Sequence, residues 1–388
     1  MKSRIHIVSV LLGALSFCFA LPTSAATRAE PGLPTALRAA LDPSAISPDS
    51  VGIYARRIDG RATALALNAE QPLSPASVMK LVTTYAALEM LGPAYTWQTD
   101  FLGDGPLRDG ALQGNLYIRG GGDPKITLER FWLWLRELRA RGIERIDGDV
   151  ILDQSLFSRS ADNFVDDEPL RAYKAEPRAL LVNFNAFRVR LVPDAGNTVI
   201  VDMFPSLKEI AVDNRLRSSA APCVAWRDSL NYGIETQAGT RVLKLEGGFP
   251  VSCGARELQL ELIDAEAYIG ALFQSLWREL GGVLKGRVRV AETPPAATLI
   301  ASFHSEPLAL AIRDINKYSN NVMARQLLLT LAARAQRPAT RAIGVQAIET
   351  WLKANGLLAP GLIIENGSGL SRNERISARG LGKLLEHG

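Results

Sequence analysis

The fold is decided by the stretch Ser74-Pro-Ala-Ser-Val-Met-Lys-Leu-Val-Thr-Thr-Tyr-Ala-Ala-Leu-Glu-Met-Leu-Gly92, which predicts a helix with both ends marked. Ser74 suits the N-cap, and Pro75 suits the first helical position, where an N–H would have no partner. Gly92, followed by Pro93, is typical of a helix end. Because the residues between are apolar on almost every side, we expect this helix to lie inside a domain.

The first turns of this helix carry two side chains that could take part in catalysis, Ser77 and Lys80. They are three residues apart and share a face. A buried lysine is costly unless it is paired or neutral, so its pKa is expected to fall. A neutral amine beside a hydroxyl, near the positive end of a helix dipole, is a serine nucleophile with its base. The alternative is a lysine that reaches the surface beside a structural serine.

Residues 1–26 predict a secretory signal peptide that is cleaved on export. Lys2 and Arg4 make its basic start, residues 5–20 are apolar, and Thr23-Ser-Ala-Ala26 offers small residues for cleavage. The alternative is a membrane anchor, but the apolar run is short of the ~20 residues that a span needs. We therefore expect no integral membrane span after cleavage.

The few cysteines and histidines limit which disulfides, catalytic bases and metal sites the chain can form. Cleavage leaves Cys223 and Cys253, and an oxidising compartment favours a disulfide between them, with two free buried thiols as the alternative. The whole chain has only three histidines, which argues against a Ser-His-Asp hydrolase and against metal sites and favours a lysine base. The net charge of +4 includes two residues of the signal peptide, so nothing points to nucleic acid. No cofactor is expected.

Hydrophobic patterns predict an α/β chain of two or three domains, in which β-rich material interrupts a helical domain. Residues 51–68 predict a hairpin around the turn Asp59-Gly60. Between residues 96 and 299, short strand patterns alternate with turns, and amphipathic helices are predicted at 127–141 and 265–280. Helical patterns return at 307–318, 320–335 and 339–355, and Ser377 is placed to cap a last helix.

Three motifs resemble, in their order and separation, those of the penicillin-binding DD-peptidases. Residues 75–92 resemble the active-site helix of the class C group, the D-alanyl-D-alanine carboxypeptidase/endopeptidases of the penicillin-binding protein 4 type. Residues 315–324, Ile-Asn-Lys-Tyr-Ser-Asn-Asn-Val-Met-Ala, resemble its S-x-N region, and residues 365–372, Glu-Asn-Gly-Ser-Gly-Leu-Ser-Arg, its glycine-rich signature. The resemblance implies a transpeptidase-like domain, an antiparallel sheet flanked by helices, at 27–95 and 300–388, with β-rich insertion at 96–299.

The same resemblance implies a periplasmic serine enzyme that acts on peptidoglycan stem peptides and cross-links and is acylated by penicillin and other β-lactams. Ser77 is then the nucleophile, Lys80 its neutral base, and backbone N–H groups hold the oxyanion. Ser319 would relay a proton to the leaving amine, unless it is an ordinary N-cap, and Asn321 would hold Lys80 and the substrate amide. A substrate-binding role is carried to Asp153, with a turn-holding role at the end of a strand as the alternative.

The third motif of the family, K-T-G or K-S-G, has no match in this sequence. In the family it lies on a strand a few tens of residues beyond the glycine-rich loop and binds the terminal carboxylate of the substrate. We therefore expect the sequence to be part of a longer active enzyme, truncated before this motif. Two other classes stay open, a serine β-lactamase, which shares the S-x-x-K helix, and a non-catalytic periplasmic protein.

Overall fold

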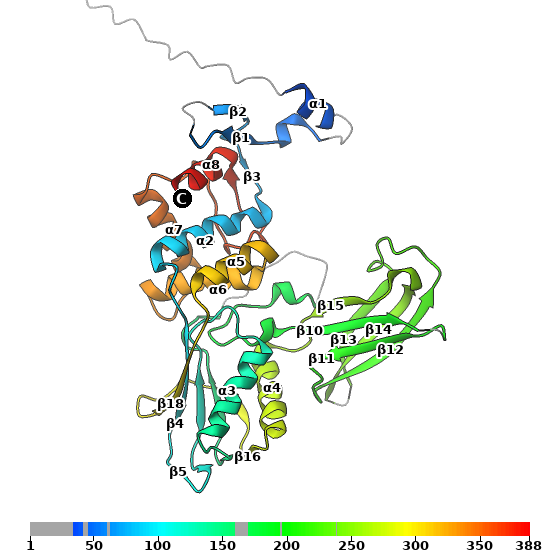
Figure 1. Ribbon diagram of the computed structural model, residues 1–388, viewed down its shortest axis with the longest axis vertical. Helices are drawn as coiled ribbons and strands as arrows, with labels where there is room; N and C mark the ends of the chain where they lie inside the picture. The colour runs from blue at the N-terminus through cyan, green and yellow to red at the C-terminus, as the bar shows by residue number, and fades with distance from the viewer. Residues whose placement is uncertain (1–33, 42–45, 60–62, 160–169, 195, 238) are drawn as a thin grey trace, which may run out of the picture.

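The computed structural model describes residues 34–41, 46–59, 63–159, 170–194, 196–237 and 239–388 (Figure 1). The predicted signal peptide lies outside these residues. Among the helices of the described part, none combines the length and apolar character needed to cross a membrane. The chain forms a mixed α/β structure, as its sequence patterns predict.

The predicted buried helix is α2 (Met79–Leu91), which lies among α5 (Leu308–Tyr318), α6 (Asn321–Ala335) and α7 (Arg341–Ala354) (Figure 1). Its apolar side chains are buried against residues of those helices, which include Ile315, Leu327 and Ile348. The helix ends where predicted, because Gly92 takes φ 82°, a value that L residues with side chains rarely adopt. The prediction that this helix lies inside a domain is confirmed.

The predicted start of the helix is wrong. The α-helix begins at Met79 and is preceded by a 3₁₀ turn, η3 (Ala76–Val78), so Ser74 is not its N-cap and Pro75 is not its first residue. Ala76 has φ 45°, a left-handed value that no residue inside an α-helix adopts. The chain therefore cannot run as one helix from Pro75, and Ser77 lies in a separate turn ahead of α2.

Segments from early and late in the described part of the chain meet above α2 (Figure 1). The predicted hairpin is the antiparallel pair β1 (Ile53–Arg56) and β2 (Thr63–Leu67), preceded by α1 (Thr35–Leu41). A second short pair joins β3 (Pro72–Leu73) to β19 (Ile376–Ser377), and α8 (Ala378–His387) packs against β1 (Figure 1). Ser377 caps α8 as predicted, since its hydroxyl accepts the Gly380 N–H at 3.1 Å.

Below the helices lies a five-stranded sheet with the order β17-β9-β7-β4-β18. Its strands are β17 (Val288–Val290), β9 (Val150–Asp153), β7 (Leu116–Arg119), β4 (Gln98–Gly103) and β18 (Thr298–His304). The helices predicted at 127–141 and 265–280 are α3 (Leu128–Ala140) and α4 (Ala265–Glu279), which share the hydrophobic core of this part with the sheet. A smaller sheet, β16-β8-β6-β5, continues its lower end; the members are β5 (Leu107–Arg108), β6 (Ala111–Leu112), β8 (Arg145–Ile146) and β16 (Val283–Leu284).

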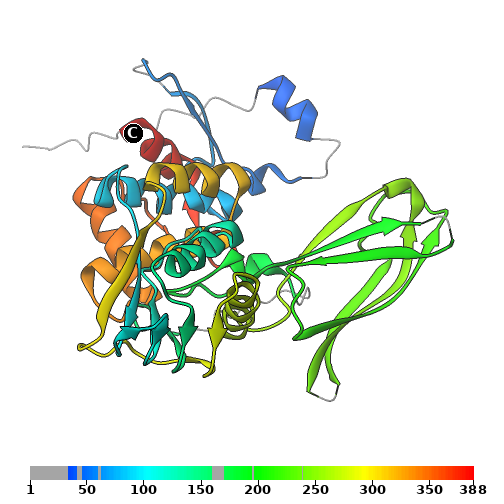
Figure 2. The same ribbon diagram turned by 60° about the horizontal axis from the view of Figure 1, so that its bottom comes forward.

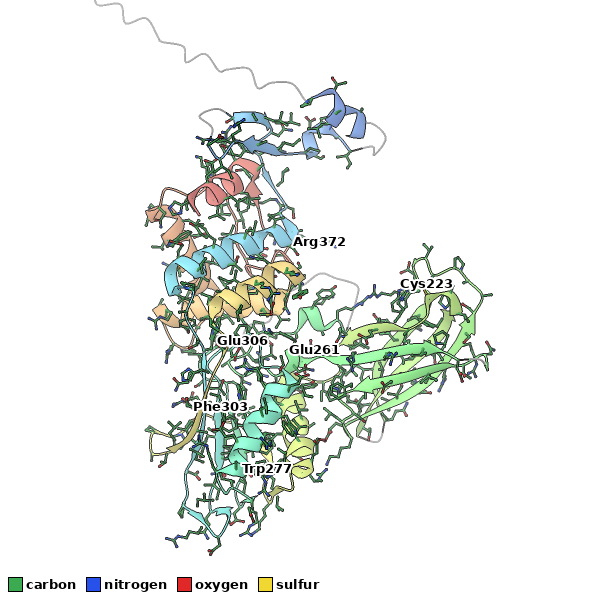
Figure 3. The ribbon with its side chains drawn as sticks, in the orientation of Figure 1. Cys223, Glu261, Trp277, Phe303, Glu306 and Arg372 are labelled. Atoms are coloured by element: carbon green, nitrogen blue, oxygen red, sulfur yellow. A yellow bond between two sulfur atoms is a disulfide. The ribbon has the colours of Figure 1, made fainter. Side chains whose placement is uncertain are left out.

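A pair of three-stranded sheets projects to one side of the molecule (Figure 2). One has the order β11-β10-β15, with bounds Val199–Phe204, Phe187–Pro193 and Arg256–Leu260, and the other the order β12-β14-β13, with bounds Ile210–Ser219, Thr240–Pro250 and Leu230–Gln237. Cys223 and Cys253 form a disulfide in this projecting part, where Figure 3 labels Cys223. The predicted pairing is confirmed.

Candidate active site

The site begins at the break between η3 and α2. Ser77 is exposed in the 3₁₀ turn, whereas Lys80, in the first turn of α2, is only 2% exposed. Lys80 Nζ lies 3.2 Å from Ser77 Oγ. The turn thus places an accessible hydroxyl against a buried amine, as expected for a nucleophile and its base.

Lys80 has two further oxygen neighbours, each from a distant part of the chain. Its Nζ donates to Asn321 Oδ1 at 2.6 Å and to the carbonyl oxygen of Ser368 at 2.5 Å. A neutral amine has two N–H bonds and one lone pair. With both N–H bonds directed at these two acceptors, the lone pair is left for the hydroxyl proton of Ser77.

The environment of Lys80 favours this neutral form. Burial lowers the pKa of Lys80 to about 8, and the negative charge of Glu374 partly opposes that shift. At pH 7 about one tenth of the lysine is then neutral, compared with less than about a thousandth at the model-peptide pKa. The expectation that burial lowers the pKa of this lysine is confirmed in direction, and its role as the base stays a prediction.

The S-x-N segment lies at the turn between α5 and α6. Ser319 is exposed, with the left-handed φ of 55° that ends α5, and Asn321 is the first residue of α6. The N-cap of α6 is Asn320, which accepts the Met323 N–H at 3.0 Å, so Ser319 is not that cap. The structure brings Asn321 to Lys80, and the proton-relay role of Ser319 stays a prediction.

A glycine-rich loop, residues 364–374, closes the other side of Lys80. Besides the carbonyl of Ser368, it presents the carbonyl of Gly367, which accepts from Thr83 Oγ1 at 2.8 Å. Gly369 lies directly against the serine turn, since a Cβ there would be 1.8 Å from the carbonyl oxygen of Ala76. Arg372 of the same loop is labelled at this end of α2 in Figure 3. The motif was recognisable from the sequence, but its backbone contacts with Lys80 and Thr83 were not.

Asp153 belongs to another part of the structure. It ends β9 in the five-stranded sheet, and its carboxylate accepts the N–H groups of Ser155 and Thr293, each at 2.9 Å. Burial alone would raise the pKa of Asp153, but these hydrogen bonds outweigh it and the pKa is lowered. Among the described hydrogen bonds, none joins Asp153 to the serine–lysine pair, so its contacts match the turn-holding alternative and its substrate-binding role stays a prediction.

An exposed serine hydroxyl set against a buried lysine amine is typical of the class of enzymes in which a lysine is the base of a serine nucleophile. Comparison with known proteins places the chain more narrowly. The profile of the D-Ala-D-Ala carboxypeptidase 3 (S13) family matches residues 33–388, and the chain belongs to this family. The family, the mixed α/β fold class and the enzymatic class, a DD-carboxypeptidase, are therefore confirmed as predicted from the sequence.

Two named relatives are similar over most of the chain. The D-alanyl-D-alanine carboxypeptidase DacB of Haemophilus influenzae is 27% identical over 355 residues, which are 87% of this chain and 71% of that protein. A D-alanyl-D-alanine carboxypeptidase of Actinomadura is 29% identical over 329 residues, which are 81% of this chain and 60% of that protein.

Solved structures agree with the sequence relatives. Penicillin binding protein 4 (dacB) of Haemophilus influenzae superposes with a TM-score of 0.73 at 25% identity, covering 87% of this chain and 74% of that one. The same protein in complex with a β-lactam superposes with a TM-score of 0.69.

Proposed function

We propose that this chain is a serine-type D-alanyl-D-alanine carboxypeptidase/endopeptidase that cleaves peptidoglycan peptides through an acyl-enzyme on Ser77. The observation that carries the proposal is the 3.2 Å separation of Ser77 Oγ from the buried Lys80 amine. The family and the names of the two relatives support the substrate class. That the Haemophilus protein has been solved in complex with a β-lactam supports the proposal that this chain also binds β-lactams.

In the first half-reaction, Lys80 accepts the hydroxyl proton of Ser77 while Oγ attacks the carbonyl carbon between two D-alanine units. The oxyanion that forms is held by backbone N–H groups, one of them that of Ser77. The C–N bond then breaks, and the proton returns to the leaving amine by way of Ser319. Asn321 holds Lys80 and the substrate amide during these steps.

In the second half-reaction, water attacks the acyl ester. Neutral Lys80 again accepts a proton, now from the water, and the proton passes to Ser77 Oγ as the ester bond breaks. The products are a shortened peptide carboxylate and the free serine. A β-lactam acylates the same oxygen by ring opening, so its amine stays attached to the adduct instead of leaving. The adduct persists where deacylation is slow.

The cellular setting and the domain assignment belong to the same proposal. The basic start and apolar run of residues 1–26 support export by a signal peptide to the periplasm. The core that α2 shares with α5, α6 and α7 supports assignment of residues 27–95 and 300–388 to one catalytic domain, with 96–299 as an insertion.

A labelled penicillin tests the proposal. The folded chain is incubated with the reagent, digested, and analysed by mass spectrometry, and the adduct is expected on the peptide that contains Ser77. The matched control is Ser77→Ala, which should lose the label, because among the described hydrogen bonds only this hydroxyl meets the amine of the buried lysine. Absence of label on the folded chain would remove the enzymatic interpretation, and rapid release of the label would favour a β-lactamase.

A further inference from the structure

A single carboxylate, that of Glu374, holds the conformation of the loop that contacts Lys80. Glu374 is completely buried, and its Oε1 accepts the N–H groups of Glu365, Asn366 and Gly367, each at 3.0 Å. The backbone N–H of Gly369 also attracts this carboxylate. Three consecutive N–H groups can converge on one oxygen only if the backbone curls around it, so the carboxylate determines the shape of the loop.

The shape of this loop decides where the oxygen that faces Lys80 lies. Residues 363 and 375 pair with each other through N–H to carbonyl bonds of 2.9 and 3.0 Å, which fixes the two ends of the loop. Inside it, Asn366 Oδ1 accepts both the N–H and the hydroxyl of Ser368, at 2.9 and 2.7 Å. Asn366 is in turn one of the residues bound to Glu374, so a continuous set of hydrogen bonds runs from Glu374 to the Ser368 carbonyl that accepts from Lys80.

Glu374 also acts on Lys80 through charge. Its negative charge favours the protonated amine, in opposition to the burial that favours the neutral one. Lys80 is a charged side chain on which this carboxylate acts. Backbone N–H groups of the carboxylate's own loop stabilise its charge, and the Arg375 guanidinium donates to the backbone carbonyl of Glu374 at 2.8 Å. Burial in turn raises the pKa of Glu374, against the effect of those N–H groups.

We infer that Glu374 is a positioning residue for the reaction: it curls the loop of residues 365–369 so that the Ser368 carbonyl meets Lys80, and its buried carboxylate acts on Lys80 through its charge. The inference rests on the proposed function of Lys80 as the base of Ser77. It assigns a role to a side chain whose described hydrogen bonds go to its own loop and not to Ser77.

Glu374→Gln separates the two effects, because an amide oxygen can still accept the loop N–H groups while the charge is gone. The rate of Ser77 acylation by a labelled penicillin is measured between pH 5.5 and 9.5. We expect the acidic limb of the profile to move to lower pH by on the order of one unit, because loss of the negative charge makes the protonated lysine less stable. A purely structural role would change the limiting rate and leave the limb in place.

Glu374→Asp and Glu365→Gln are the matched controls. The aspartate keeps the charge but is one methylene too short, so the limiting rate should fall at least about tenfold with the limb unmoved. Glu365 lies in the same loop but bonds instead to Ser371 and Asn373, so its substitution should not move the limb. A profile of Glu374→Gln that overlays the unaltered chain, or an equal shift in Glu365→Gln, overturns the inference.

Amide hydrogen exchange on the unaltered chain gives a second readout that does not depend on the folding of any variant. The N–H groups of residues 365–367 should exchange slowly, because each is bonded to a buried carboxylate, and rapid exchange at these three amides would overturn the inference. The outcomes are also distinguishable from failure of the proposed function. If Ser77 is labelled but the profiles do not differ, only the role of Glu374 is lost, whereas no label on Ser77 removes the role of Lys80 as well.

Discussion

The acylation of Ser77 should depend on pH with the pKa of Lys80, and this prediction can be worked out from the site. The lysine must be neutral to accept the hydroxyl proton, and burial lowers its pKa to about 8. Below that pH the neutral fraction falls tenfold per unit, so the rate at pH 6 should be about one hundredth of the plateau above pH 9. Removal of the amine in Lys80→Met should lower the plateau itself by about 10²- to 10⁴-fold.

The assay is stopped-flow or quenched labelling with excess β-lactam, followed by the rate of adduct formation on Ser77. Circular dichroism at each pH confirms that the chain stays folded over the range. A limb centred near pH 10, the ordinary value for lysine, would show that the amine is not buried in solution. A profile that is flat from pH 6 to 9, or a Lys80→Met variant with an unchanged rate, would refute the assignment of Lys80 as the base.

Three further predictions concern single contacts. Asn321→Ala removes the 2.6 Å acceptor of Lys80 and should slow acylation about 10- to 100-fold without unfolding the chain; an unchanged rate would exclude Asn321 from the site. Gly369→Ala should lower the melting temperature and the acylation rate, because the new Cβ would be 1.8 Å from the Ala76 carbonyl oxygen. The control is Gly356→Ala, which has a similar positive φ but open space around it, so it should cost only backbone strain of about 1 kcal/mol. Replacing both Cys223 and Cys253 by serine should lower the unfolding free energy by about 3–4 kcal/mol, measured by denaturant titration, with Ser77 labelling retained in the folded chain; an unchanged midpoint would contradict it.

The elements that could be predicted from the sequence are those that nearby residues determine. The buried helix that ends at Leu91 was predicted because an apolar run ends at a glycine, and the cap at Ser377 because its side chain bonds three residues ahead. The start of that helix was missed for a reason that lies elsewhere in the chain. Ala76 takes its positive φ where Gly369 packs against it, and no pattern within residues 74–80 reports a neighbour almost 300 residues away.

The residues of the site likewise fall into those that the sequence revealed and those that it did not. Ser77 and Lys80 were recognisable because three residues of spacing place them together, and Asn321 because a motif in a known family marks it. Thr83 and Glu374 were not found, although the first lies on the same helix face as Lys80. Their partners are backbone groups of the glycine-rich loop, and a backbone group has no letter in the sequence to mark it.

On the proposed mechanism, the two distant neighbours of Lys80 also determine when Ser77 becomes reactive. Asn321 and Ser368 lie 241 and 288 residues beyond the lysine, so neither can reach it until the chain through α6 and the glycine-rich loop has been made and packed on α2. Before then the lysine is in water, holds its proton, and leaves Ser77 an ordinary hydroxyl. We therefore expect a nascent or unfolded chain not to react with peptides or β-lactams, so that covalent labelling of Ser77 would count the molecules that have completed their fold.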